Sequence, residues 1–314
     1  MSSLSRTIKD VLYSPSTPDF LFSRYFSWKN AKDSQRLFEL LGRKNSLLDQ
    51  LRPGEREHWD GRIQDVIDCP DNADIPRHAS AGKIEDRLLI MHNGIKVDPL
   101  SYYNYPLLHM LMVNGGVHEP QEEKIFQQTL PTLSKKGPLC MLELGAYWSF
   151  YSIWFKQQFP DAHCVMVEPD RRNLSYGKRN AALNGVDGTF IHAGIGKQVD
   201  RPRNLVTVDE ICRQQGLNFI DVLHSDIQGF ELDMLHGSRE TLSQGKVGYA
   251  FISTHSNELH EQCRAHLETE YNFSLVASAN LDESFSWDGI LVMKAPDYPG
   301  IESVQISKKV KQAI

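Results

Sequence analysis

Four side chains that could do chemistry stand at or near the ends of short apolar runs in the second half of the chain. They are Glu143, Glu168, Asp226 and His255. Such runs are typical of the strands of a parallel α/β sheet, and ligands bind at the carboxyl edge of such a sheet. We therefore expect these four side chains to converge on one site.

The two glutamates suit a cofactor that contains a ribose. Glu143 is followed by a turn of small residues that begins at Gly145 and leads directly into a predicted helix. Only Gly145 matches a glycine of the pattern G-x-G-x-x-G, so a pyrophosphate site is not predicted, and a simple tight turn is an alternative. Glu168 could accept both ribose hydroxyls, because two acceptor oxygens match two adjacent donors. Asp170 is expected to cap the next helix.

The histidines suit proton transfer. His255 is the first candidate for a general base and His224 the second, because an ordinary histidine pKa near 6.5 allows the ring to accept a hydroxyl proton. Asp226 would either orient the His255 imidazole or join it in holding a divalent cation. Two ligands are fewer than a metal site needs, so a cation such as magnesium is not expected. Each lone histidine could also be a hydrogen-bonded structural residue.

Apolar runs alternate with helical stretches through the second half of the chain, which predicts a parallel α/β sheet. The predicted strands span residues 139–144, 163–168, 189–192, 219–225, 247–253, 273–278 and 289–294. The predicted helices span 148–159, 171–184, 208–215, 230–235 and 258–271. No helix separates the last two strands, so they should pair antiparallel.

The first part of the chain is predicted to be mainly helical. Its apolar residues fall at helical spacing in several stretches, and its proline and glycine residues mark where these stretches stop. We expect helices that begin at Ser34, that carry Trp59 to Ile67, that span 102–113 and that start at Pro120, with a small hairpin about Asn93-Gly94.

Composition and charge restrict the class of protein. The 314 residues are 40% hydrophobic and 24% charged, which is ordinary for a globular protein. The net charge of −6 provides no positive field for a nucleic acid backbone. No apolar run approaches the roughly 20 residues of a membrane span, and Lys9 interrupts the place of a signal peptide. We expect a cytoplasmic protein whose five scattered cysteines are reduced.

Several short motifs follow one another in a specific order. They are Glu143-LGAYWS, VMV-Glu168-Pro169-Asp170, His192-Ala193-Gly194, Thr207-Val208-Asp209 and His224-Ser225-Asp226-Ile-Gln228-Gly229-Phe-Glu231. Over about residues 118 to 294 this order resembles the FkbM family of S-adenosylmethionine-dependent methyltransferases. The resemblance implies a class I methyltransferase (Rossmann-like) α/β sheet of seven strands with the last strand antiparallel. It also implies S-adenosylmethionine as the cofactor.

The resemblance assigns the cofactor-binding residues position by position. They are Glu143, Gly145, Ala146, Tyr147, Glu168, Pro169, His192, Ala193, Ser225 and Asp226. Glu168 would hold the ribose hydroxyls, and Ala193 would border the adenine. The family's motif K-x-D-x-E-G-x-E has Gln228 here in place of an acid, which changes the charge of the pocket.

The function implied is O-methylation of a hydroxyl on a sugar or secondary-metabolite small molecule. N-methylation of a small-molecule amine is one alternative. A nucleotide-binding oxidoreductase is another, and a catalytically silent module with the same fold is a third. We expect a small-molecule acceptor, with no nucleic acid or membrane partner, and a homodimer is left open. The chain divides into residues 1–117, a substrate cover or an oligomer contact, and residues 118–314, the methyltransferase domain.

Overall fold

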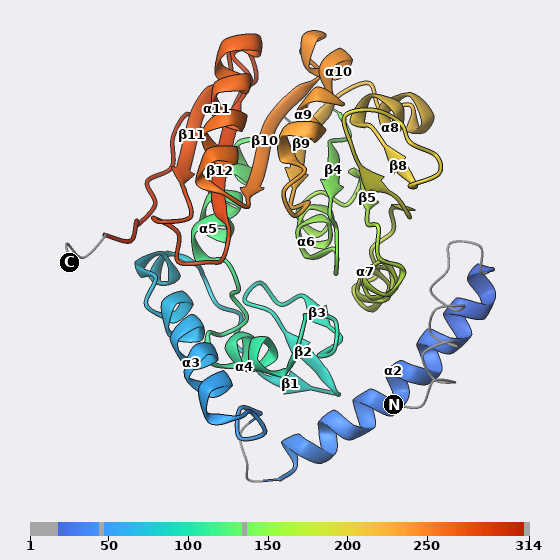
Figure 1. Ribbon diagram of the computed structural model, residues 1–314, viewed down its shortest axis with the longest axis vertical. Helices are drawn as coiled ribbons and strands as arrows, with labels where there is room; N and C mark the ends of the chain where they lie inside the picture. The colour runs from blue at the N-terminus through green and yellow to red at the C-terminus, as the bar shows by residue number, and fades with distance from the viewer. Residues whose placement is uncertain (1–17, 44–46, 134–136, 311–314) are drawn as a thin grey trace.

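The apolar runs of the second half of the chain form one seven-stranded sheet, in the order β11-β12-β10-β9-β4-β5-β6 (Figure 1). The computed structural model describes residues 18–43, 47–133 and 137–310. The strands are β4 (Cys140–Leu144), β5 (His163–Val167), β6 (Thr189–Ile191), β9 (Ile220–Ser225), β10 (Val247–Thr254), β11 (Ser274–Ala279) and β12 (Gly289–Lys294). The central strands are buried on both faces, so their sequences are continuously apolar rather than alternating.

Strand direction confirms the predicted fold class. β12 is antiparallel to both of its neighbours, β10 and β11, and the other paired strands of this sheet are parallel. The chain order reverses at β4, which pairs with β5 on one side and with β9 on the other. At such a reversal the connections leave in opposite directions, and the carboxyl ends of the strands border a crevice in which ligands bind.

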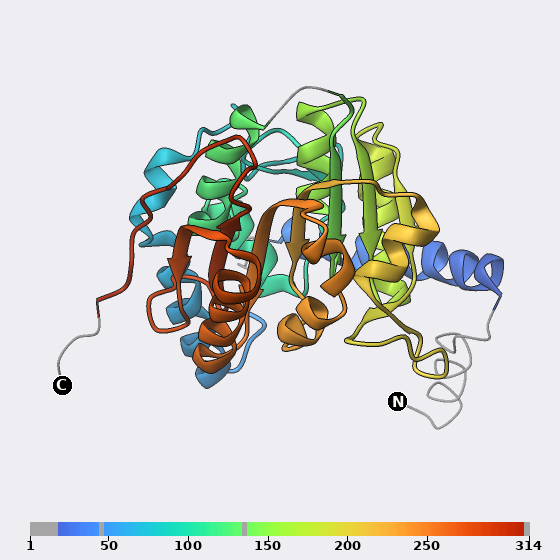
Figure 2. The same cartoon turned by 90° about the horizontal axis from the view of Figure 1, so that it is seen from above.

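Helices cover both faces of the sheet (Figure 2). One face carries α5 (Pro120–Thr129), α6 (Phe150–Gln158) and α7 (Arg171–Leu183). The other carries α8 (Val208–Gln215), α9 (Glu231–His236), α10 (Arg239–Ser243) and α11 (Asn257–Tyr271). Asp170 caps α7 as predicted, since its side chain accepts from two backbone N–H groups of the first turn. Neither α10 nor the short pair β7 (Gly194–Ile195) and β8 (Leu205–Val206) was predicted.

The N-terminal residues lie across one end of the sheet (Figure 1). They form α2 (Asp19–Leu41), α3 (Pro53–Ile67), α4 (Tyr105–Val113) and a small sheet of β1 (Ile84–Glu85), β2 (Leu88–Ile90) and β3 (Lys96–Val97). Two one-turn helices, Pro70–Asp74 and Leu130–Thr132, connect neighbouring elements. Within the described ranges, no helix has the length and apolar character needed to cross a membrane.

One prediction for this region is wrong, because Ser34 does not start a helix. It lies inside α2, where no proline or glycine interrupts the stretch from Asp19 to Leu41. The other predicted N-terminal helices and the hairpin about Asn93-Gly94 are present. The buried apolar side chains of this region and of the sheet form one continuous core.

Asp98 joins the N-terminal region to the sheet layer through buried hydrogen bonds. Its carboxylate accepts from Asn30 of α2 at 2.8 Å and from Arg179 of α7 at 2.6 Å. Its backbone N–H donates to the Asn180 side chain at 2.9 Å. Asp98 is 3% exposed, so water cannot replace these partners if the carboxylate is removed.

We therefore predict that Asp98→Ala lowers the free energy of unfolding by about 2 kcal/mol, because Asn30 loses its buried acceptor. Urea denaturation followed by circular dichroism measures this change. Glu240→Gln is the control, since Glu240 pairs with Arg213 on the surface, and its denaturation midpoint should not move. A change below about 0.5 kcal/mol for Asp98→Ala would contradict the role given to this contact.

Candidate active site

The turn after β4 approaches the end of β9 so closely that only glycine fits. Gly145 has a φ of +71°, and a Cβ atom placed there would lie 1.7 Å from the Asp226 carbonyl oxygen. Tyr147 and Ser149 also have positive φ values, 45° and 60°, so the turn holds an unusual backbone path up to the start of α6. The turn after β4 and the end of β9 are thereby brought into contact at the point where the strand order of the sheet reverses.

Glu168 follows β5 and faces this turn. Its Oε2 accepts from the Tyr147 N–H at 2.9 Å, and its Oε1 accepts from the Asp170 N–H at 2.8 Å. Burial raises the pKa of this carboxyl group, and the hydrogen bonds from Asp170 and Tyr147 oppose that shift. Each oxygen keeps acceptor capacity beyond its bond to the backbone, so the carboxylate can still take two hydroxyl donors.

A cavity of about 310 Å³ lies between Gly145, Glu168 and Asp226. The predicted cofactor residues Tyr147, Pro169 and Ala193 also line it. The side chains that the sequence prediction missed come from the short β7 and β8 pair, from α7 and from the loop after Asp226. They are Asn173, Ile195, Leu205, Ile227 and Phe230, and Gln228 of the predicted motif lines the cavity with them. This mixture of one carboxylate pair with apolar walls is suited to a nucleoside.

Four of the predicted cofactor residues lie outside this cavity. Glu143 and Ala146 line a neighbouring cavity instead. The His192 ring donates to the Pro169 carbonyl at 2.9 Å and is not among the cavity's lining residues. Ser225, the last residue of β9, is fully buried and lines neither cavity. Glu143 and Ser225 lie in strands, where neighbouring side chains point to opposite faces, and a prediction by motif does not take this into account.

The neighbouring cavity, of about 70 Å³, shares Tyr103, Gly145, Tyr147 and Asp226 with the first. The Tyr103 N–H donates to the Tyr147 hydroxyl at this shared wall. The N-terminal region contributes much of the lining through α3, α4 and the loop between β3 and α4. These residues are Arg62, Val66, Tyr102, Tyr103, Leu107 and Met110. Two cavities therefore meet at the carboxyl end of the sheet, which is the arrangement that a methyl donor and an acceptor need. We refer to the cavity beside Glu168 as the cofactor cavity and to its neighbour as the acceptor cavity.

His255 lies beside Asp226 and Asp288, which line the second cavity, but it lines neither cavity itself. Its Nδ1 donates to Glu231 Oε1 at 2.8 Å, so Glu231, which was not predicted as a partner, also orients the ring. Its Nε2 lies 3.4 Å from Asp226 Oδ1 and 3.2 Å from Asp288 Oδ1. Asp288 was missed by the sequence prediction. It immediately precedes β12, and the start of an antiparallel strand lies at the same edge as the ends of its neighbours.

The charges around His255 decide its protonation. Burial favours the neutral ring, but Asp226, Glu231 and Asp288 favour the charged one and raise its pKa to about 10. Burial and the nearby Asp226 raise the pKa of Asp288 to about 7. With a pKa of about 10, the His255 ring keeps its second proton at neutral pH. The general-base role of His255 stays a prediction, and it requires that this proton be displaced.

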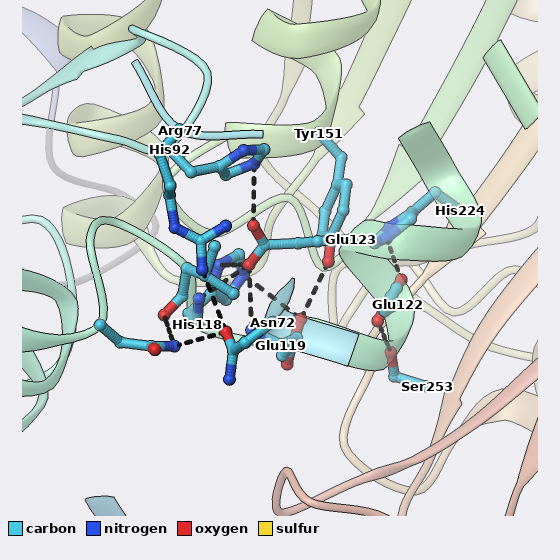
Figure 3. A network of polar contacts seen from close by, with 12 residues as sticks. Asn72, Arg77, His92, His118, Glu119, Glu122, Glu123, Tyr151, His224 and Ser253 are labelled. Carbon is cyan, nitrogen blue, oxygen red and sulfur yellow. Dashed lines mark hydrogen bonds and ion pairs between the residues drawn. The ribbon is translucent and has the colours of Figure 1, made fainter. Parts of the chain in front are cut away.

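His224, the second predicted base, is held in a buried ion pair. Its Nε2 donates to Glu122 Oε1 at 2.7 Å, and Ser253 donates to the other oxygen of Glu122 at 3.1 Å (Figure 3). The Tyr151 ring packs against it with centroids 4.2 Å apart. Burial opposes the charged ring, yet Glu122 raises the pKa of His224 above its ordinary value. His224 thus lines the acceptor cavity as half of an ion pair rather than as a free base.

A second buried cluster, formed by His92, His118 and Glu123, lies next to the residues that line this cavity. Glu123 lies 2.7 Å from His118 Nδ1 and 2.9 Å from His92 Nε2, and all three side chains are almost fully buried (Figure 3). Burial opposes the charged His118 ring, but Glu123 and Glu119 raise its pKa to about 10. Burial also opposes the Glu123 charge, but His118 and His92 hold the pKa of Glu123 far below its usual range. This cluster fixes His118 and Glu119, which line the acceptor cavity.

Comparisons with known proteins find similarity to methyltransferases. The family model described as Methyltransferase FkbM domain matches residues 198–275. The chain is 25% identical over 206 residues to "2-O-methyltransferase NoeI" of Sinorhizobium fredii (strain NBRC 101917 / NGR234), across 52% of this chain and 83% of that protein. Its fold is also similar to two solved methyltransferases. M. capricolum TrmK in complex with S-adenosyl-homocysteine has 10% identity, a TM-score of 0.38 and coverage of 58% and 71% of the two chains. Methyltransferase FkbM from Methylobacillus flagellatus KT has 17% identity, a TM-score of 0.37 and coverage of 62% and 56%.

The protein is an S-adenosylmethionine-dependent methyltransferase. The resemblance to the FkbM methyltransferases that the order of the motifs predicted is confirmed by the family model and by the similarity to NoeI.

We predict that Gly145→Ala weakens S-adenosylhomocysteine binding at least about tenfold, or 1.4 kcal/mol, because the added Cβ must displace the Asp226 carbonyl. Calorimetric titration measures the affinity. Gly185→Ala is the matched control, since Gly185 also has a positive φ (+64°) but no atom within 4 Å of the added Cβ. Equal affinity in wild type and Gly145→Ala would contradict the placement of the cofactor.

We also predict a pH dependence from the His118 and Glu123 pair. A raised histidine pKa stabilises the fold fully below about 6.5, and this contribution is lost as pH rises toward 10. The lowered Glu123 pKa stabilises the fold above about 4.5, and this contribution is lost as pH falls. The unfolding free energy of wild type should therefore exceed that of His118→Gln most between about pH 4.5 and 6.5. A difference independent of pH between 6 and 10 would show that His118 is not charged in the fold.

Proposed function

We propose that this methyltransferase transfers the methyl group to a hydroxyl of a small polyol such as a sugar. The observation that carries the proposal is the second cavity, which shares the wall of Tyr103, Gly145, Tyr147 and Asp226 with the cofactor cavity. An acceptor held there faces the cofactor without intervening chain. The name of the relative NoeI, a 2-O-methyltransferase, supports oxygen as the acceptor atom.

The cofactor supplies an activated methyl group, because its sulfonium sulfur is already a good leaving group. Once bound, it would give this methyl group to the acceptor oxygen, and the electron pair of the sulfur–carbon bond would stay on sulfur. The hydroxyl proton must leave. The chain's task is therefore alignment of the acceptor, exclusion of water and disposal of one proton. Gly145 and Tyr147, at the shared wall, are placed for the first of these tasks.

The lining of the acceptor cavity suits a polyol. Trp287 and Tyr102 offer aromatic faces, on which the C–H side of a sugar ring can pack, and Glu119, Asp226 and Asp288 offer acceptors for hydroxyls. Trp287 is held by Trp59 of α3, with ring centroids 5.3 Å apart. Arg62, also on α3, lies over the same ring at 4.9 Å from its centroid. These contacts support the prediction that the N-terminal region covers the substrate.

An amine is the second candidate acceptor, because the same three carboxylates would attract an ammonium group. In that case attraction between opposite charges, rather than hydrogen bonding to hydroxyls, would hold the acceptor in the cavity. The replacement of an acid by Gln228, which suggested a silent module, has a structural role here. Its amide donates to Asp226 Oδ1 at 2.9 Å and holds that carboxylate in place. Turnover separates an enzyme from a silent module.

The test is a panel of sugar alcohols, glycosides and amines incubated with the enzyme and S-adenosylmethionine. Mass spectrometry detects a gain of one methyl group, and NMR distinguishes an O-methyl from an N-methyl product. O-methyl products support the proposal. N-methyl products alone would transfer it to the amine, and no product from any acceptor class, with cofactor binding intact, would contradict it.

Within this proposal we predict that Trp287→Ala raises the acceptor KM at least about tenfold while S-adenosylhomocysteine affinity is unchanged, because Trp287 lines only the acceptor cavity. Steady-state kinetics and calorimetry give the two values. Trp28→Ala is the control, since Trp28 is exposed on α2 and lines neither cavity. Equal changes in both affinities would show that Trp287 supports the whole site rather than the acceptor.

A further inference from the structure

Three neighbouring strands place metal-binding side chains at one point. Asp226 directly follows β9, His255 directly follows β10, and Asp288 directly precedes β12. One ligand atom from each of the three lies within 4.8 Å of the other two. Because β10 pairs with both β9 and β12, this juxtaposition is set by the sheet and not by a flexible loop.

The His255 ring is held in the orientation that a ligand needs. The fully buried Glu231 accepts the Nδ1–H, and Glu231 is itself fixed by the Gly229 N–H at 3.0 Å. The other ring nitrogen, Nε2, is buried and makes no hydrogen bond to any residue that the structure describes. A carboxylate on one imidazole nitrogen, with the second nitrogen directed at a cation, is the usual arrangement of a metal-binding histidine.

The charge around this point is negative. Asp226 and Asp288 face Nε2 together, and Glu119 lines the same cavity. Among the lining residues of the acceptor cavity, Arg62 is the sole lysine or arginine, and it lies over the Trp287 ring and beside Asp65. Three carboxylates, those of Asp226, Glu231 and Asp288, surround the single imidazole of His255, and such a group in a partly buried site attracts a divalent cation.

We propose that Asp226, His255 and Asp288 bind a divalent cation that accepts both oxygen and imidazole ligands, such as Mn²⁺ or Mg²⁺. Its remaining positions face the acceptor cavity, so an acceptor hydroxyl can enter the coordination sphere. The cation would lower the pKa of that hydroxyl, whose proton then passes to water while the oxygen stays on the metal and attacks the methyl carbon. This last step rests on the proposed function, whereas cation binding does not.

The experiment is a titration of the chelator-treated full-length chain with Mn²⁺, followed by electron paramagnetic resonance of free Mn²⁺ and by calorimetry. We expect one Mn²⁺ per chain with a Kd below about 100 μM, and competition by excess Mg²⁺. Asp288→Asn and His255→Ala should weaken binding more than about tenfold, and Glu231→Gln about tenfold through the ring orientation. Glu240→Gln, a surface carboxylate on α10, should bind as wild type does.

Circular dichroism and S-adenosylhomocysteine titration in the presence of chelator show whether each variant is folded. Absence of saturable Mn²⁺ binding up to about 1 mM would overturn the cation site. Binding that is unchanged in the folded Asp288→Asn and His255→Ala variants would overturn it as well. Neither result depends on an acceptor, so failure of the cation site is distinguishable from failure of the proposed O-methylation.

Discussion

The contact between Gly145 and the Asp226 carbonyl is the constraint on which the site depends. Because a Cβ at position 145 would lie 1.7 Å from that oxygen, the turn after β4 and the end of β9 can approach only through glycine. This approach occurs at the reversal of strand order. It makes Gly145 and Asp226 part of the wall of both cavities, so one backbone contact fixes where cofactor and acceptor meet.

Buried charge is the second organising feature. Glu123 with His118 and His92, and Glu122 with His224 and Ser253, place paired ions behind the acceptor cavity (Figure 3). Removing one member of such a pair costs more than the pair contributes, because the other charge is left buried without a partner. The pairs therefore fix the position of α5 relative to β9, to β10 and to the N-terminal region. Glu119, Asp226 and Asp288 are among the carboxylates that line the acceptor cavity beside these pairs.

Much of the fold could be predicted because buried parallel strands are continuous apolar runs with helical stretches between them. The same logic located Glu168, Asp226 and His255, since each follows a strand of the sheet. Asp288 was missed because the prediction considered only residues that follow strands. Asp288 precedes β12, and an antiparallel strand begins at the edge where its parallel neighbours end. Glu231 was missed as the partner of His255 because hydrogen bonding between a helix and a strand end has no signal in spacing along the chain.

Other features could not be predicted for related reasons. Motif order placed His192 and Ser225 at the cofactor, but the His192 ring donates to the Pro169 carbonyl and the Ser225 side chain is buried, and neither residue lines the cavity. The aromatic cover formed by Trp59 and Trp287 joins residues more than 200 positions apart, which no local pattern reports. Ser34 resembled a helix start because serine is a good N-cap, yet nothing before it interrupts α2.

A crystal structure of the protein with S-adenosylhomocysteine tests the central claim most directly. The account predicts the ribose hydroxyls on Glu168 and the sulfur at the wall formed by Gly145, Tyr147 and Asp226, facing the acceptor cavity. S-adenosylhomocysteine bound elsewhere, or with its sulfur directed away from that wall, would contradict the account.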